Sequence, residues 1–245
     1  MIEKHLDLPT ADGAMNTFVV HPEEGGPHPV VLFYMDAPGK REELHDMARR
    51  LASVGYFVVL PNLYYRRSRD FVLRERTPEA MAPMFELMNS LTNALVVRDT
   101  EAMLRFVDAQ PQAADGRRVG AVGYCMSGPF VFDAAAAFPD RLQAIAALHP
   151  ANMVTASDDS PHRLAPRIRC EAYVGCAEID KWMPPETVRT LQQAMDAAGM
   201  RYRLEWYPGA EHGFTFPRRE GIYQRDAAER HWERLFALFE RNLRH

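Results

Sequence analysis

The chain has 245 residues, of which 47% are hydrophobic and 25% charged, a size and balance that fit one α/β domain. Its formal net charge of −4 argues against the concentrated basic face that nucleic-acid binding needs. Residues Met1–Asp7 lack the apolar core of a signal peptide, and no run approaches the roughly 18 apolar residues of a membrane span. The chain has three cysteines, an odd number that suggests no disulfide framework. We therefore expect a cytoplasmic monomer or small homo-oligomer, with no nucleic-acid or membrane partner.

Short apolar runs typical of strands alternate with helical patterns along the chain. The strand candidates are Thr17–Val20, Val30–Tyr34, Phe57–Leu60, Val119–Tyr124, Ala144–Leu148, Ala172–Cys176 and Arg203–Tyr207. Alternation of this kind predicts an α/β fold in which a mostly parallel sheet carries helices on both faces. We expect residues 1–245 to form a single domain.

A stretch from about residue 66 to 110 breaks this rhythm, because it contains helical patterns and no strand. Its apolar face consists of Met81, Met84, Phe85, Met88 and Leu91. Such a face fits a partial cover over a binding site, in which methionines adapt to varied ligands. A methionine stripe of this spacing also fits ordinary core packing.

The segment Arg118–Gly128 runs from an apolar strand into Cys125, which is framed by Gly123, Ser127 and Gly128. A nucleophile at the tip of a tight strand-to-helix turn needs small neighbours on both sides, and this pattern predicts such a nucleophile elbow. The helix expected at Pro129–Phe138 directs its positive end toward the sulfur and favours the thiolate. The alternative is a buried structural cysteine.

Two further residues follow predicted strands in the order that a catalytic triad requires. Asp180 comes after Ala172–Cys176, and His212 comes after Arg203–Tyr207. The carboxyl ends of parallel strands meet at one edge of a sheet, so we expect Cys125, Asp180 and His212 to converge there. In that arrangement His212 takes the thiol proton and Asp180 orients the imidazole. Glu178 lies close enough in sequence to compete for the role of the acid.

Together these motifs resemble the dienelactone hydrolase family, the cysteine-nucleophile branch of the α/β-hydrolases. The resemblance spans nearly the whole chain and implies an α/β-hydrolase fold with Cys125 as nucleophile. The residues that carry it are Gly55–Tyr56, Pro61–Tyr64, Gly123–Met126, Asp180 with Pro184–Pro185, and Gly209–Phe214.

The resemblance also gives roles to residues after the strand at Val30–Tyr34. The backbone amides of Ala37 and Met126 would form the oxyanion hole, where negative charge develops during acyl transfer. Asp36 stands where members that act on dienelactone have a glutamate that keeps the resting thiol neutral. Asp36 is therefore either a thiol-gating residue or a solvated loop aspartate.

Family members that act on dienelactone bind the substrate carboxylate with two arginines. Near the first position this chain has Tyr64 and Arg66, and Phe216 stands at the second. An aromatic ring there favours a more apolar ester or lactone. His149, after another predicted strand, either lines the substrate pocket or is a structural histidine.

We therefore expect a hydrolase that cleaves small carboxylic esters or lactones through an acyl-cysteine intermediate. The alternatives are a thioesterase, a catalytically silent small-molecule binder and a redox-sensing thiol. No metal or other cofactor is expected. The segment Glu42–Asp46 lacks the paired histidines of a zinc helix, and Gly120, Gly123 and Gly128 do not give the dinucleotide-binding spacing.

Overall fold

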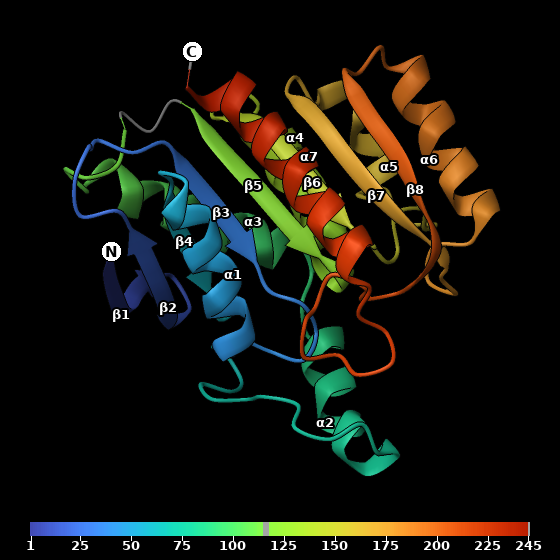
Figure 1. The fold of residues 1–245 in the computed structure, drawn as a ribbon, viewed down its shortest axis with the longest axis horizontal. Helices are drawn as coiled ribbons and strands as arrows, with labels where there is room; N and C mark the ends of the chain where they lie inside the picture. The colour runs from blue at the N-terminus through green and yellow to red at the C-terminus, as the bar shows by residue number, and fades with distance from the viewer. Residues whose placement is uncertain (115–117, 245) are drawn as a thin grey trace. The chain divides into compact units, whose positions relative to one another are not determined.

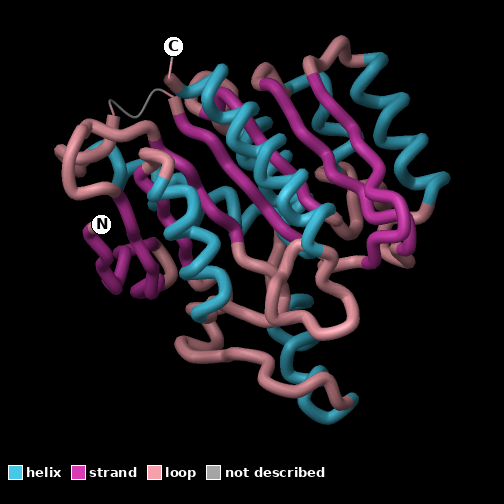
Figure 2. Tube along the Cα trace, viewed as in Figure 1, coloured by secondary structure: helices cyan, strands magenta, loops and turns pink. Residues whose placement is uncertain are grey.

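The computed structural model of the chain describes residues 1–114 and 118–244 (Figures 1 and 2). The chain forms two compact units, residues 1–116 and 117–245. Each unit has strands at its centre and helices packed against them. The two units are described in turn.

The first unit contains a sheet with both parallel and antiparallel pairs. Its strands lie in the order β1 (Ile2–Thr10), β2 (Gly13–His21), β4 (Phe57–Pro61) and β3 (Val30–Tyr34). Strands β1 and β2 form an antiparallel hairpin, β2 pairs antiparallel with β4, and β3 runs parallel to β4. Every residue of β3 and β4 is buried, as expected from their unbroken apolar sequences.

Strand β1 is absent from the sequence-based prediction. Most of its residues are exposed, and it lacks the apolar run that marks β3 and β4. Its conformation is fixed by pairing with β2 along its whole length, from Ile2 opposite His21 to Thr10 opposite Gly13. The strand therefore depends on hairpin hydrogen bonds, which a search for apolar runs does not detect.

Three helices complete the described part of the first unit. Helix α1 (Glu42–Ser53) packs against β2 and β4, and α2 (Pro78–Asn89) and α3 (Asn93–Asp108) occupy the stretch predicted to be helical. Within α2 only Met84 is buried. The methionine-rich face of α2 is therefore not packed into the core of the unit.

The second unit contains four parallel strands, in the order β5 (Val119–Tyr124), β6 (Leu142–Leu148), β7 (Glu171–Ile179) and β8 (Tyr202–Glu211). Helices α4 and α7 pack on β5 and β6 from opposite faces (Figure 1). The helices of this unit are the 3₁₀ turns η1 (Cys125–Ser127) and η2 (Ala165–Arg167), with α4 (Gly128–Ala137), α5 (Pro161–Leu164), α6 (Pro185–Ala197) and α7 (Arg225–Leu243). Because all four strands are parallel, their carboxyl ends lie at one edge.

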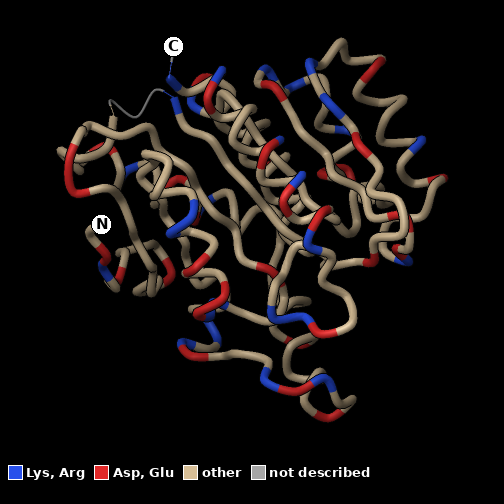
Figure 3. The backbone as a smooth tube through the Cα atoms, viewed as in Figure 1, with Lys and Arg blue, Asp and Glu red and all other residues tan. Residues whose placement is uncertain are grey.

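Acidic and basic residues are interspersed along both units (Figure 3). Many arginines are paired with carboxylates, as Arg49 is with Glu3 and Arg69 with Asp7. The described helices include none that is long and apolar enough to cross a membrane.

The turn after β5 leaves no room for a side chain at Gly123. A Cβ there would lie 2.3 Å from the backbone oxygen of Ser127. We expect Gly123→Ala to lower the free energy of unfolding by about 1–3 kcal/mol, because overpacking forces the backbone to shift. Denaturant unfolding measures this loss. The control is Gly26→Ala, at an exposed position where the nearest atom is a histidine ring nitrogen at 3.3 Å, and an equal loss in both variants would contradict the expectation.

Candidate active site

Cys125 lies at the tip of a strained turn between β5 and η1. Its φ of 56° is in the left-handed region, which non-glycine residues rarely adopt. The backbone oxygen of Cys125 accepts a hydrogen bond from the Ala151 amide at 3.0 Å, which holds the turn in place. Strand, strained residue and helix follow one another as the elbow pattern predicts.

The small residues around Cys125 allow close packing. Ser127 is completely buried, and a Cβ at Gly128 would lie 2.3 Å from Cβ of Pro150. The Ser127 hydroxyl is therefore shielded from solvent, whereas Cys125 is partly exposed.

The other two cysteines differ from Cys125 in their surroundings. Cys170 and Cys176 are buried free thiols, and burial raises the pKa of each to about 12. Both therefore remain protonated at neutral pH and are poor nucleophiles. Of the three thiols, Cys125 alone combines partial exposure with a position at a strand-to-helix turn.

Asp180 and His212 each follow the last residue of a parallel strand, β7 and β8, and their side chains meet. Nδ1 of His212 lies 2.7 Å from Oδ2 of Asp180. Because a carboxylate only accepts hydrogen bonds, Nδ1 carries the proton and donates it. The other carboxylate oxygen of Asp180 accepts from the Trp182 amide at 2.9 Å, and the carboxylate is fully buried. This pair fixes the tautomer and orientation of the imidazole.

Glu178, the competing acid in the sequence, has a different partner. Its Oε2 accepts a hydrogen bond from the Gly209 amide at 2.6 Å, and the residue is exposed. The geometry therefore favours Asp180 as the partner of His212.

His212 is also coupled to Cys125. Its Nε2 is buried and has no hydrogen-bond partner of standard geometry among the described residues, although Cys125 lies close enough to act on the ring electrostatically. Burial lowers the pKa of His212, but the charge of Cys125 and the hydrogen bond to Asp180 outweigh burial and raise the pKa to about 9. The His212 ring is therefore held mainly in its protonated form at neutral pH.

The raised pKa of His212 makes its contribution to the stability of the fold depend on pH. Because the folded pKa, about 9, exceeds the ordinary value of 6.5, His212 stabilises the fold below pH 6.5, and this contribution is lost as the pH rises through about 9. We expect the His212 ring to titrate near pH 9 by NMR. In Cys125→Ala the titration should move to lower pH, because the interaction with Cys125 that raises the pKa of His212 is gone. An unchanged titration in that variant would contradict the coupling.

Aromatic rings pack near the His212 imidazole. His149 is fully buried, its Nε2 lies 2.8 Å from Oγ1 of Thr215, and its ring meets the His212 ring edge-on at a centroid distance of 5.1 Å. Burial lowers the pKa of His149 well below its usual value, so its ring is neutral. Phe216 is 1% exposed and lies 5.3 Å from His149 and 5.6 Å from Tyr124. His149 is thus a buried packing partner of His212.

The loop after β3, in the first unit, carries Asp36 and Ala37. Asp36 is 1% exposed, and its carboxylate binds the Arg41 guanidinium at 2.5 and 3.3 Å. Arg41 also binds Glu43 and the Gly39 carbonyl. The interpretation of Asp36 as a solvated loop residue is therefore wrong.

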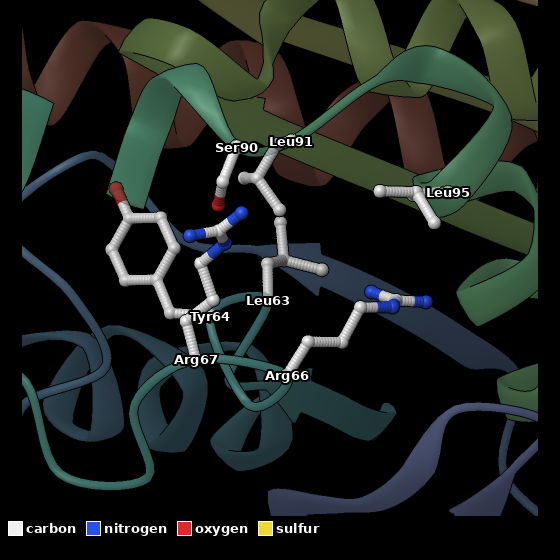
Figure 4. A pocket seen from close by; sticks show the side chains of 7 residues that line it. All are labelled: Leu63, Tyr64, Arg66, Arg67, Ser90, Leu91 and Leu95. Carbon is white, nitrogen blue, oxygen red and sulfur yellow. The ribbon is translucent and has the colours of Figure 1, made fainter. Parts of the chain in front are cut away.

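A cavity of about 470 Å³ in the first unit is lined by both candidate substrate-binding residues of this unit (Figure 4). The lining residues are Leu63, Tyr64, Arg66, Arg67, Ser90, Leu91 and Leu95. The Arg66 guanidinium is bound by Asp99 at 2.6 and 2.8 Å and by Asp12 at 2.8 Å. Arg67 is exposed, and its guanidinium has no hydrogen bond or ion pair among the described residues. Arg67 is thus the uncompensated cation at this cavity.

The structure also reveals supporting residues that the sequence patterns do not indicate. The Arg219 guanidinium donates to the His212 carbonyl at 2.9 Å and lies over the Phe216 ring. It also fills the space beside Gly213, where a Cβ would lie 1.3 Å from the guanidinium. The contact of Arg219 depends on how its loop folds back on His212, and the neighbours of Arg219 in sequence give no signal of it.

The chain is similar to several known proteins. The model of the dienelactone hydrolase family matches residues 15–243. A Methylorubrum extorquens protein named "Putative carboxymethylenebutenolidase" is 29% identical over 245 residues, covering 96% of this chain and 79% of that protein. A Synechocystis protein of the same name is 24% identical, covering 98% of this chain and 96% of that protein.

Similarity to a solved structure settles the fold. The crystal structure of a "Putative Dienelactone Hydrolase" from Klebsiella pneumoniae has a TM-score of 0.86 and 26% sequence identity, covering 97% of this chain and 98% of that chain. The expected α/β-hydrolase fold is thereby confirmed.

Proposed function

The chain belongs to the dienelactone hydrolase family and is a hydrolase, and from this premise we propose that it cleaves small carboxylic esters or lactones through an acyl-cysteine intermediate. One observation carries the proposal. The Asp180–His212 hydrogen bond of 2.7 Å holds an imidazole whose pKa is raised by the partly exposed thiol of Cys125. Such a set of groups activates a sulfur nucleophile.

In the proposed reaction, the Cys125 thiolate attacks the carbonyl carbon and the carbonyl oxygen becomes an oxyanion. The tetrahedral intermediate collapses as His212 donates its proton to the departing alkoxide, leaving a thioester on Cys125. A water molecule then attacks the thioester while His212 takes its proton, and the acid product leaves. Asp180 stabilises the imidazolium throughout. We propose the backbone amides of Ala37 and Met126 as the oxyanion donors.

We propose Asp36, Tyr64, Arg66 and Phe216 as the residues that gate the thiol or bind substrate. The ion pair with Arg41 holds the buried Asp36 carboxylate in place, which supports a role for Asp36 in gating the thiol. The cavity beside Tyr64 and Arg66 is lined by three leucines and two arginines, which suits a partly apolar substrate. Phe216 supports the same preference, since it supplies an aromatic ring where dienelactone-hydrolysing members have arginine.

The alternatives are separated by a substrate panel. We expect the wild-type protein to hydrolyse p-nitrophenyl acetate, p-nitrophenyl butyrate and a simple lactone faster than an acyl thioester. Faster turnover of the thioester would favour a thioesterase. A silent binding or redox-sensing protein would turn over none of these substrates. In such a protein, iodoacetamide would label Cys125 slowly under native conditions, and His212→Asn would not change the labelling rate.

We further propose that residues 1–245 act as one hydrolase domain, because the family model spans 15–243 without interruption. The half-buried methionine-rich face of α2 supports a partial cover formed by residues 66–110. The three free cysteines support a reducing, cytoplasmic location. Interspersed charges and the net charge of −4 support a small-molecule partner rather than nucleic acid, with the protein a monomer or small homo-oligomer.

A further inference from the structure

Tyr64 lines the cavity and also makes a hydrogen bond to the loop after β3. Its side chain is 1% exposed, and its hydroxyl donates to the Ala37 carbonyl oxygen at 2.9 Å. The Tyr64 ring lines the cavity, and its hydroxyl points away from the Arg66 guanidinium (Figure 4). One residue therefore faces the cavity with its ring and the loop after β3 with its polar end.

This hydrogen bond is one of two that fix the backbone around Ala37. The Ala37 carbonyl belongs to the peptide unit after its Cα, and the Ala37 N–H belongs to the peptide unit before it, together with the Asp36 carbonyl. That Asp36 carbonyl accepts from the Gly39 amide at 3.1 Å. Since peptide units are planar, the Gly39 bond orients the peptide unit that carries the Ala37 N–H, and the Tyr64 bond orients the peptide unit on the other side of the Ala37 Cα.

Other contacts make the same loop rigid but do not touch Ala37. Arg41 binds the Asp36 carboxylate and the Gly39 carbonyl, and the Leu73 amide donates to the Pro38 carbonyl at 2.9 Å. Gly39 has φ +93°, and a Cβ there would lie 2.3 Å from the Phe71 carbonyl oxygen. The loop is thus held on both sides of Ala37, and the Tyr64 hydroxyl supplies the contact to Ala37 itself.

We propose that Tyr64 is a positioning residue that aims the Ala37 N–H at the oxyanion of the acyl-transfer intermediate. The inference rests on the proposed function, in which that N–H is an oxyanion donor. A donor stabilises the oxyanion only at the correct angle and distance, and loss of one donor typically lowers kcat by about 10²–10³-fold. A donor that is present but wrongly oriented should lower kcat by a smaller factor than a donor that is lost.

The test is Tyr64→Phe, which keeps the ring at the cavity and removes only the hydroxyl. We expect kcat for p-nitrophenyl acetate to fall by about 10- to 100-fold, with KM nearly unchanged, because the donor acts in the transition state. The matched control is Tyr65→Phe. Tyr65 is the next residue, and its hydroxyl contacts Asp99 and Thr10 at 2.9 and 2.8 Å instead of Ala37. This control should lose stability with little loss of kcat.

A second readout separates positioning from general loosening of the fold. Replacing the ester carbonyl oxygen by sulfur gives a thionoester, and sulfur accepts hydrogen bonds weakly. Wild type should prefer the oxygen ester, and Tyr64→Phe should reduce that preference by the same factor by which it lowers kcat. Tyr65→Phe should leave the preference unchanged.

The outcomes distinguish this inference from the proposed function. An unchanged kcat and oxygen preference in Tyr64→Phe, or equal losses in Tyr64→Phe and Tyr65→Phe, would overturn the positioning role while leaving a cysteine-dependent esterase intact. Absence of esterase activity in wild type, or full activity in Cys125→Ala, would overturn the proposed function itself.

Discussion

Cys125→Ala should lower kcat for p-nitrophenyl acetate by about 10⁴-fold or more, because removal of a nucleophile leaves only the weak catalysis of the remaining site. The substitution removes one sulfur from a partly exposed position, so the fold should persist. Steady-state hydrolysis, with circular dichroism to verify the fold, measures the effect.

Cys170→Ala is the matched control for this experiment. Cys170 is 4% exposed, and burial raises the pKa of its thiol to about 12, so it should contribute to packing rather than to chemistry. Its replacement should leave kcat close to that of wild type. Comparable losses in both cysteine variants would indicate that activity depends on the fold and not on the Cys125 sulfur.

Asp180→Asn should lower kcat by about 10³–10⁴-fold, since an amide no longer fixes the imidazole tautomer or stabilises the imidazolium. The pKa of His212 should fall as well, because the hydrogen bond to Asp180 is one cause of its rise. Loss of that rise removes the protonated acid that the leaving group needs. Rate measurements and NMR titration of the His212 ring on the same variant report both effects.

Glu178→Gln serves as the control for the acid. Glu178 lies two residues before Asp180 and accepts from the Gly209 amide, so its charge is not required by His212. We expect nearly wild-type rates. A greater loss for Glu178→Gln than for Asp180→Asn would reassign the acid of the triad.

Much of the fold follows from the sequence, because apolar runs and strand ends are local features. The prediction of a strand over Val30–Tyr34 coincides with β3, and that over Val119–Tyr124 coincides with β5. The order of Cys125, Asp180 and His212 after strands predicts a meeting at one sheet edge, and in the structure Asp180 lies against His212. Their catalytic roles remain predictions.

The supporting contacts could not be derived in the same way. The hydrogen bond from Tyr64 to Ala37 joins residues 27 positions apart in sequence, and its existence depends on how two loops pack. The pairing of Arg66 with Asp99 spans 33 positions and leaves Arg67, not Arg66, as the unpaired cation. Neither contact has a period or motif, because each is set by tertiary packing.

In the proposed mechanism, the Cys125 sulfur carries the acyl group during turnover. Rapid acid quenching of the reaction with p-nitrophenyl butyrate, followed by mass spectrometry of the intact protein and its peptides, tests it directly. We expect a single butyryl group on the peptide that contains Cys125, and none on the Cys125→Ala protein. A butyryl group on Ser127, or rapid hydrolysis by Cys125→Ala, would contradict it.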